Sequence, residues 1–202
     1  MTSKKDDIVA LALRLIKTKG FLSLSYDDIS KELGITKAAI HYYFEKKEDL
    51  GIAVCEKLQS GLVASYERTL DQMAQHNGEP WYFIGSRIDT IMPNEICPIS
   101  SLQGDYEDLP IRLKEKIEEL SMSEIELLGQ LVKEYYACSH AQETVVTTLM
   151  SVKGALQYRR ILGEKIFYDT IENVRKQFCA IEHEDQGEGD ECNRKNDSRQ
   201  SI

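Results

Sequence analysis

The 202-residue chain is poor in proline and cysteine, with four and five of these residues. The cysteines are odd in number, scattered along the sequence and never spaced as Cys-x-x-Cys, which disfavours a disulfide framework and a zinc site. Such usage is typical of a reducing compartment. No apolar run approaches the ~20 residues that a membrane span needs, and the N-terminus lacks a signal-peptide pattern. We therefore expect a soluble cytoplasmic protein with no membrane partner.

The signatures of common catalytic sites are also missing. The sequence contains no GxxxxGK[ST], no GxGxxG after a strand, no HExxH and no GxSxG. Neighbouring carboxylates such as Glu118 and Glu119 diverge around a helix, so they do not form an acid–base pair. The sequence does not favour an enzyme, and we expect no cofactor and no metal.

Positive charge is scarce except at the N-terminal end. The whole chain has a net charge of −9. Residues 1–50 hold nine basic and eight acidic residues, a net +1, and the other 152 residues hold 16 basic and 26 acidic residues, a net −10. An acidic body is repelled by phosphate, so any contact with nucleic acid is expected at the N-terminal end.

The spacing of apolar residues predicts an all-α fold of about nine helices. Ile8, Leu11 and Leu15 recur at helical intervals, and no run alternates as a β-strand would. Gly51 and Gly61 are expected to weaken the long fourth helix locally. Two short helices are expected inside residues 25–50, and the others at 6–19, 48–75, 81–92, 97–106, 108–138, 142–162 and 164–181.

Three segments follow from this pattern. We expect a three-helix head at residues 1–50, a larger helical body at residues 51–182 and a disordered acidic tail at residues 183–202. The tail loses its hydrophobic residues and is rich in charge, glycine and asparagine.

Residues 25–50 carry the most specific local pattern in the chain. Ser25 and Asp28 have the spacing of a capping box at the start of a helix. Gly34 follows where a helix C-terminus favours a left-handed residue, and Thr36 can cap the next helix. A capped helix, a glycine turn and a second capped helix predict a helix-turn-helix, whose second helix enters the DNA major groove.

This arrangement resembles the tetracycline-repressor (TetR) family of transcriptional regulators, most strongly over residues 8–54. The resemblance rests on Gly20–Phe21, on the run from Ile29 to Lys37, on the run from Ala39 to Phe44 and on the run from Lys46 to Leu50. A weaker resemblance covers residues 154–163, which are similar to the penultimate helix of the family.

The resemblance implies contacts with a double-stranded DNA operator. Lys37 suits a base-reading role, because its amine can donate to guanine acceptors. The alternative for these residues is an ordinary exposed polar face, with Ser25 and Thr36 as plain helix caps. Lys4 and Lys5 are further candidates, on a flexible arm. The eight expected contacts are Ser25, Tyr26, Thr36, Lys37, Ala38, His41, Tyr42 and Lys46.

The family commonly forms homodimers, and the last two helices are the expected interface. Two such helices from each chain would form a four-helix bundle. The alternative is that the same apolar stripe belongs to the internal core, because an amphipathic face does not tell which chain it packs on. The expected interface residues are Val152, Ala155, Leu156, Arg159, Leu162, Ile171, Val174 and Phe178.

The resemblance also implies a pocket for an unknown small-molecule effector in the body. Aromatic side chains in the middle helices suit such a pocket, with core packing as the alternative. Cys97, which precedes a predicted helix start, is a candidate thiol sensor, with a buried structural role as the alternative. The expected pocket residues are Trp81, Phe83, Met92, Tyr106 and Tyr135.

Together these features predict a ligand-responsive transcriptional regulator. We expect a repressor that binds a palindromic operator as a dimer and is released by the effector. The alternative is a helical DNA-binding protein whose body binds a protein partner or senses thiol-reactive compounds through Cys97.

Overall fold

The computed structural model describes residues 3–75, 78–136 and 141–180, and these form helices without a strand. The all-α prediction is confirmed. The predicted tail at residues 183–202 lies outside the described residues. The elements are α1 (Lys4–Lys19), α2 (Tyr26–Leu33), α3 (Lys37–Tyr43), α4 (Lys47–Ala74), α5 (Trp81–Ile88), α6 (Pro98–Gly104), the 3-10 helix η1 (Tyr106–Asp108), α7 (Ile111–Tyr136), α8 (Ala141–Leu162) and α9 (Glu164–Cys179).

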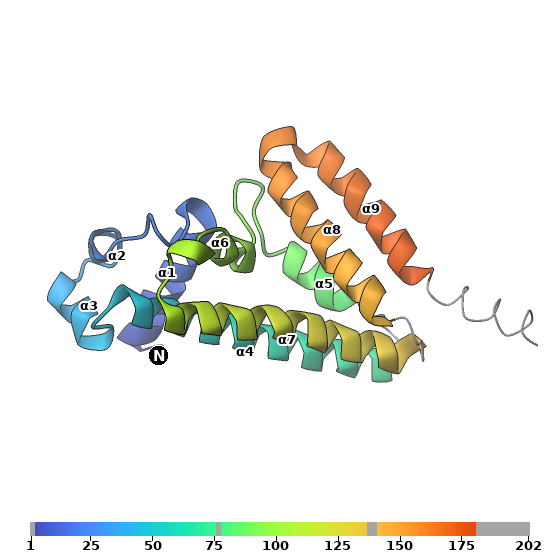
Figure 1. Ribbon diagram of the computed structural model, residues 1–202, viewed down its shortest axis with the longest axis horizontal. Coiled ribbons are helices and arrows are strands. Elements are labelled where there is room, and N and C mark those ends of the chain that lie inside the picture. Colours follow the sequence, from blue (N-terminus) through green and yellow to red (C-terminus); the bar gives the residue numbers. More distant parts are fainter. Residues whose placement is uncertain (1–2, 76–77, 137–140, 181–202) are drawn as a thin grey trace, which may run out of the picture.

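The helices form a small head at one end and a longer body (Figure 1). α1, α2 and α3 make the head. The long helices α4 and α7 lie side by side along the body, and α8 and α9 form an antiparallel pair above them (Figure 1). α4 starts in the head and runs into the body, so it can carry a displacement from one to the other.

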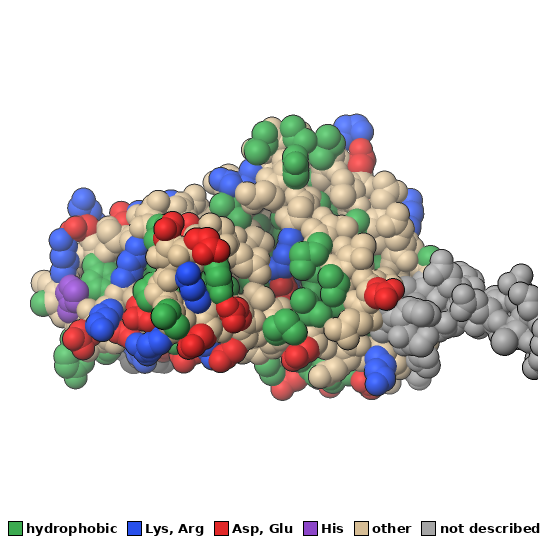
Figure 2. All heavy atoms as spheres, viewed as in Figure 1, with side chains coloured by type: hydrophobic (Ala, Val, Ile, Leu, Met, Phe, Trp, Pro, Cys, Tyr) green, Lys and Arg blue, Asp and Glu red, His purple; other side chains and the backbone are tan. Residues whose placement is uncertain are grey.

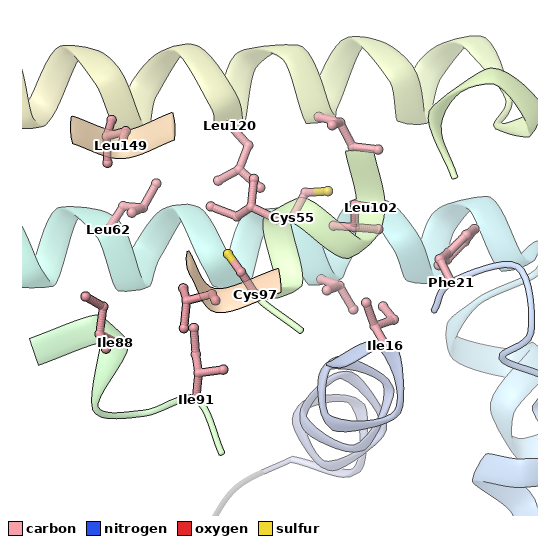
Figure 3. Close-up of a cluster of buried hydrophobic side chains, with 14 of the residues drawn as sticks. Ile16, Phe21, Cys55, Leu62, Ile88, Ile91, Cys97, Leu102, Leu120 and Leu149 are labelled. Carbon is pink, nitrogen blue, oxygen red and sulfur yellow. The ribbon is translucent and has the colours of Figure 1, made fainter. Parts of the chain in front are cut away.

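The head and the body share one continuous hydrophobic core. Figure 3 shows Ile16 of α1 and Leu102 of α6 close to Cys55 of α4. Two hydrogen bonds join α1 to α6 and to the loop before it: the Ser101 hydroxyl donates to the carbonyl of Ile16 at 2.9 Å, and the amide of Ile96 donates to the carbonyl of Lys17 at 2.8 Å. The expected boundary between residues 50 and 51 falls inside α4. The distinction between head and body is therefore one of proposed role and not of separate folding units.

Gly51 of α4 is a packing requirement, which corrects the expectation that it merely weakens the helix. A β-carbon at this position would lie 2.7 Å from Cδ2 of Leu113 and 2.9 Å from the ring of Phe21. Gly61 has open space around it, with nothing within 4 Å of an added β-carbon. Only the first glycine is needed for a close helix approach.

The helix at 81–92 is shorter than the sequence predicted, because α5 ends at Ile88. Met92 lies in the following loop, where its amide donates to the carboxylate of Glu95 at 3.0 Å. The loop then turns back to α1 through the bond between Ile96 and Lys17. A loop thus replaces the last helical turn and ties the body to the head.

Candidate nucleic-acid interface

The predicted capping pattern of the helix-turn-helix is confirmed. Ser25 and Asp28 form a reciprocal capping box at the start of α2. Gly34 ends α2 in the left-handed conformation with φ of 63°, which favours glycine. The hydroxyl of Thr36 accepts a hydrogen bond from the amide of Ala39 at 3.2 Å and so caps α3. These local bonds fix the angle between the two helices.

α3 has a buried side and an exposed side. Ile40 and Phe44 are buried in the head core. Thr36, Lys37, Ala38 and His41 are exposed, and Tyr42 is 83% exposed. Figure 2 shows the head end as a mixture of basic, acidic and histidine side chains. The free face of α3 therefore offers donors, a methyl group and an aromatic ring to a partner.

The amine of Lys37 lies 2.7 Å from a carboxylate oxygen of Asp27, and both side chains are about half exposed. An exposed pair of this kind contributes only about 0–1 kcal/mol to stability. Its energy is small enough for Lys37 to exchange Asp27 for a base acceptor.

Lys46 is exposed at the N-cap position of α4. Its backbone amide donates to the carboxylate of Asp49 at 3.0 Å, which leaves the side chain at the positive end of the helix dipole. This position suits a phosphate contact.

Tyr26, one of the eight expected DNA contacts, uses its hydroxyl inside the head. Its hydroxyl donates to the carbonyl of Phe44 at 2.9 Å and so ties α2 to the end of α3. Burial, with a smaller contribution from the charge of Asp49, raises the pKa of Tyr26 to about 12. The hydroxyl is thus occupied within the head. The Tyr26 ring also meets the ring of His41 edge-on, with centroids 4.8 Å apart.

Ser25 likewise uses its hydroxyl inside the protein. It donates to the carboxylate of Asp28 at 2.6 Å, and the amine of Lys19 binds the same oxygen at 2.6 Å. The hydrogen bond from Lys19 and those from Ser25 lower the pKa of Asp28 well below its usual range. In the structure Ser25 acts as a helix cap, and its expected contact with DNA stays a prediction.

The N-terminal lysines do not form the expected flexible arm. α1 begins at Lys4 behind a capping box between Ser3 and Asp6, and the amine of Lys5 lies 5.7 Å from the centroid of the Phe44 ring. The amine of Lys47 donates to the carbonyl of Leu22 at 2.9 Å. Burial lowers the pKa of Lys47.

Most of the expected dimer residues pack against their own chain. Val152, Ala155, Leu156, Arg159, Val174 and Phe178 are buried, and Ile171 is half-buried on the same core. Leu162 is exposed. The stripe read from the sequence is the inner face of α8 and α9, because α7 and α5 already cover it. The apolar residues left exposed on these helices are Met150, Tyr158, Ile161, Leu162, Ile166 and Tyr168.

The expected pocket residues do not line one cavity. Phe83 is fully buried and Met92 is exposed in its loop. The Tyr106 hydroxyl donates to Glu118 at the surface, and Tyr135 is exposed. Trp81 lines an open groove of about 900 Å³ between α5 and α9.

A second cavity of about 560 Å³ lies between α1, α4 and the α5–α6 segment, and sequence reasoning missed it. Its basic residues come from three helices, so no local sequence motif indicates that they lie together. We call it the cationic cavity, after the basic residues Lys17, Lys57, Arg68 and Arg87 in its wall.

Cys97 is 5% exposed and lies in the core at the start of α6. Figure 3 shows it among Ile91, Leu62 and Leu102. Most of its surface is covered by apolar side chains, which is the environment of a structural cysteine. The structure therefore favours the alternative to a thiol sensor. No helix within the described ranges is long and apolar enough to cross a membrane.

Comparison with known proteins adds a family to this geometry. The sequence pattern of "Bacterial regulatory proteins, tetR family" matches residues 8–54. The "Biofilm operon icaADBC HTH-type negative transcriptional regulator IcaR" of Staphylococcus epidermidis is 39% identical over 177 residues, covering 86% of this chain and 92% of that protein.

Two further matches differ in extent. The uncharacterised HTH-type transcriptional regulator YerO of Bacillus subtilis is 38% identical over 56 residues, and the match spans 28% of this chain and only 19% of that relative. The crystal structure of a TetR transcriptional regulator from Legionella pneumophila has a TM-score of 0.79 at 22% identity, covering 88% of this chain and 98% of that chain. At that identity the likeness concerns the fold.

Proposed function

The chain belongs to the TetR family of bacterial regulators and is a DNA-binding transcriptional regulator, not an enzyme, and from this premise we propose that it represses transcription as a homodimer on a palindromic operator. The observation that carries the proposal is the capped α3 with its exposed polar face. The name of IcaR describes a negative regulator, which supports repression.

In this proposal α3 lies in the major groove of the operator. Thr36, Lys37, Ala38 and His41 face the bases, and Lys37 donates to guanine acceptors after leaving Asp27. Tyr42 and Lys46 contact phosphates and fix the docking position. Ser25 and Tyr26 contribute indirectly by holding α2 and α3 in place.

The outer face of α8 and α9 is the proposed dimer surface. Met150, Tyr158 and Ile161 follow one another along one side of α8, and Gly154 of that side leaves room for a close approach. Figure 2 shows hydrophobic side chains gathered at the end where α8 and α9 meet. Burying such residues against a second chain provides the apolar core that homodimer interfaces need. The dimer would space two α3 helices about 34–36 Å apart, one turn of DNA.

An effector would act through the body. A small molecule that binds one arrangement of the dimer more tightly shifts the population towards it. α4 spans head and body, so a change in the body alters the spacing of the heads. Heads at the wrong spacing lose the second half-site and hence specific binding.

Selection of bound duplexes from a random DNA pool tests this function. We expect enrichment of a palindrome whose half-sites are one helical turn apart, bound by two chains. Ile161→Glu places a charge on the proposed dimer face and should give a monomer by sedimentation with loss of palindrome preference. Gln130→Glu, which adds the same charge at an exposed position of α7 outside the proposed face, is the control. Equal affinity for selected and scrambled duplexes at every salt concentration would reject the proposal.

A further inference from the structure

The cationic cavity has walls from both the head and the body. Leu13 and Lys17 come from α1, and Thr90 and Ile99 come from the segment around α6. α4, α5 and the residues between α5 and α6 supply most of the rest of the wall. At about 560 Å³ the cavity is within the range of small-molecule sites, roughly 300–1,000 Å³.

The charges of this cavity have one sign. Four basic side chains line it, and no acidic side chain is among its described lining residues, although the chain as a whole has a net charge of −9. Two of the four are compensated: Lys17 binds Glu95 at 2.5 Å and Arg87 binds Glu124 at 2.5 Å. The other two, Lys57 and Arg68, belong to the exposed side of α4.

The remaining wall is largely apolar. Figure 3 shows three of these side chains, Leu62 of α4, Ile91 of the loop and Cys97 at the start of α6. A patch of hydrocarbon next to several cations is complementary to an amphiphile with a negative head. The apolar lining is made by Leu13, Leu58, Leu62, Ile91, Cys97, Pro98 and Ile99.

We propose that the cationic cavity binds an organic anion, with a carboxylate or sulfonate on an apolar body, and that this is the effector class. The inference rests on the proposed function for its regulatory consequence, but binding itself does not. The anionic group is attracted by Lys57 and Arg68, and the apolar body covers Leu58 and Leu62. A cation of the same shape is repelled by the same wall.

Lys17 offers a route from this cavity to the head. Its amine donates to the carbonyl of Thr90 at 3.1 Å and pairs with Glu95, while its own carbonyl accepts from Ile96. These bonds hold α1 against the loop after α5. An anion in the cavity competes with Glu95 for the amine, which loosens α1 from the loop and lets the head turn.

A matched pair of fluorescent probes tests the ligand class on the full chain without DNA. 8-Anilino-1-naphthalenesulfonate is the anion, and N-phenyl-1-naphthylamine is the same fluorophore without the sulfonate. We expect saturable anion binding, roughly tenfold tighter than the neutral probe and weakened by salt. Decanoate should displace the anion, whereas decan-1-ol at the same concentration should not. Equal binding of both probes would overturn the proposal.

Variants assign the binding to this cavity. Gly61 lines it, and an added β-carbon there meets nothing within 4 Å, so Gly61→Phe should place a ring in the cavity and abolish anion binding. Gly129→Phe, at an equally open helical glycine of α7, should bind as the wild type does. Unchanged binding by Gly61→Phe would locate the probe elsewhere and refute the site.

The charges are tested in the same assay. Lys57→Gln with Arg68→Gln should weaken anion binding by roughly 3- to 30-fold, since each exposed charge contributes modestly, and should reduce the salt dependence. Lys133→Gln on α7 removes an exposed lysine outside the cavity and should have no effect. An equal loss in this control would mean that overall charge, not the cavity, attracts the anion.

A separate measurement on the selected operator tests the regulatory consequence. Decanoate should release wild-type protein from the duplex and should fail to release Gly61→Phe. If the anion binds but does not release the protein from DNA, the binding site stands and its role as effector site is rejected. If no operator is found, only the proposed function is rejected.

Discussion

Two exposed ion pairs of the head and one buried charge cluster of the body differ in their exposure to water. In the head, Lys37 pairs with Asp27 and Arg14 pairs with Glu32, with side chains about half exposed. In the body, the carboxylate of Glu124 is buried between two cations, Arg87 at 2.5 Å and Lys153 at 2.7 Å. The exposed pairs can exchange partners at little cost, and the buried cluster cannot.

This difference separates contact with a partner from maintenance of the fold. A charged side chain that binds DNA must first leave its partner within the protein. Its ion pair therefore has to be weak. The Glu124 cluster joins α5, α7 and α8, and breaking it leaves charges without a partner in the interior. Changes in the body should therefore reduce stability, and changes on the free face of α3 should reduce DNA binding.

Glu124→Gln should have the largest effect on stability. Removing the carboxylate leaves Arg87 and Lys153 facing a neutral amide in a buried site, at a cost of about 3–5 kcal/mol. Urea unfolding monitored by circular dichroism measures this as a lower midpoint. Glu126→Gln, two residues along α7 and exposed, is the control and should change stability by less than about 0.5 kcal/mol. Similar midpoints for both variants would contradict the comparison.

Acid should reproduce this loss in the wild type. Burial by itself raises the pKa of Glu124, but Arg87 and Lys153 outweigh it and lower the pKa overall. A carboxyl whose pKa is lower in the folded state stabilises the protein above its unfolded pKa of about 4.3. That stabilisation is lost as pH falls through the folded value. Glu124→Gln should therefore lose less stability between pH 5 and pH 2, and an unchanged pH slope would contradict the assignment.

Lys37→Ala and Lys46→Ala test the head with DNA. Lys37→Ala should cost about 1–3 kcal/mol on the selected operator and relax the preference at one base position. Lys46→Ala should weaken all duplexes evenly and reduce the salt slope by about one unit. Fluorescence anisotropy with the operator and single-base variants at several salt concentrations measures both. Equal effects of the two changes on every duplex would contradict the division between base and phosphate contacts.

The head was predictable from sequence because its structure is set by local spacing. Ser25 and Asp28 are three residues apart, and so are Thr36 and the amide it caps, so hydrogen bonds follow directly from position. Gly34 needed only the preference of glycine for the left-handed region. The side chain of Tyr26 could not be placed in this way, since its partner, the carbonyl of Phe44, lies 18 residues away.

The helices of the body were predictable from the sequence, but which of their faces are buried was not. The periodicity that located α8 also suggested Val152 and Leu156 as interface residues, but α8 has apolar residues on two sides. Only packing against the rest of the chain distinguishes the inner face from the outer one. The cationic cavity was missed for the same reason, because Lys17 and Arg68 meet through the fold and not through a motif.

The joint between head and body can be tested at two glycines of α4. Gly51→Ala should destabilise by about 1–3 kcal/mol, because the methyl group collides with Leu113 and Phe21. Gly61→Ala has open space and should stabilise by about 0.5–1 kcal/mol through helix propensity. Thermal unfolding of both variants measures the difference. If Gly51→Ala stabilised the protein, Leu113 and Phe21 would have to move aside at little cost in free energy.

Tyr26→Phe should have the smallest effect. It tests whether Tyr26 maintains the fold or contacts DNA. The change removes the hydrogen bond to the carbonyl of Phe44 and leaves the ring in place, so stability should fall by about 0.5–1.5 kcal/mol. A phosphate contact would give another result: unchanged stability, with weaker binding to every duplex. Urea unfolding and anisotropy on the same preparation separate the two.

Tyr42→Phe is the control, because its exposed hydroxyl faces outward and its loss should leave the unfolding midpoint unchanged. Since Tyr26 joins α2 to the end of α3, a loss of stability without a change in salt slope would assign it to the framework that holds α3, and not to the face that meets DNA.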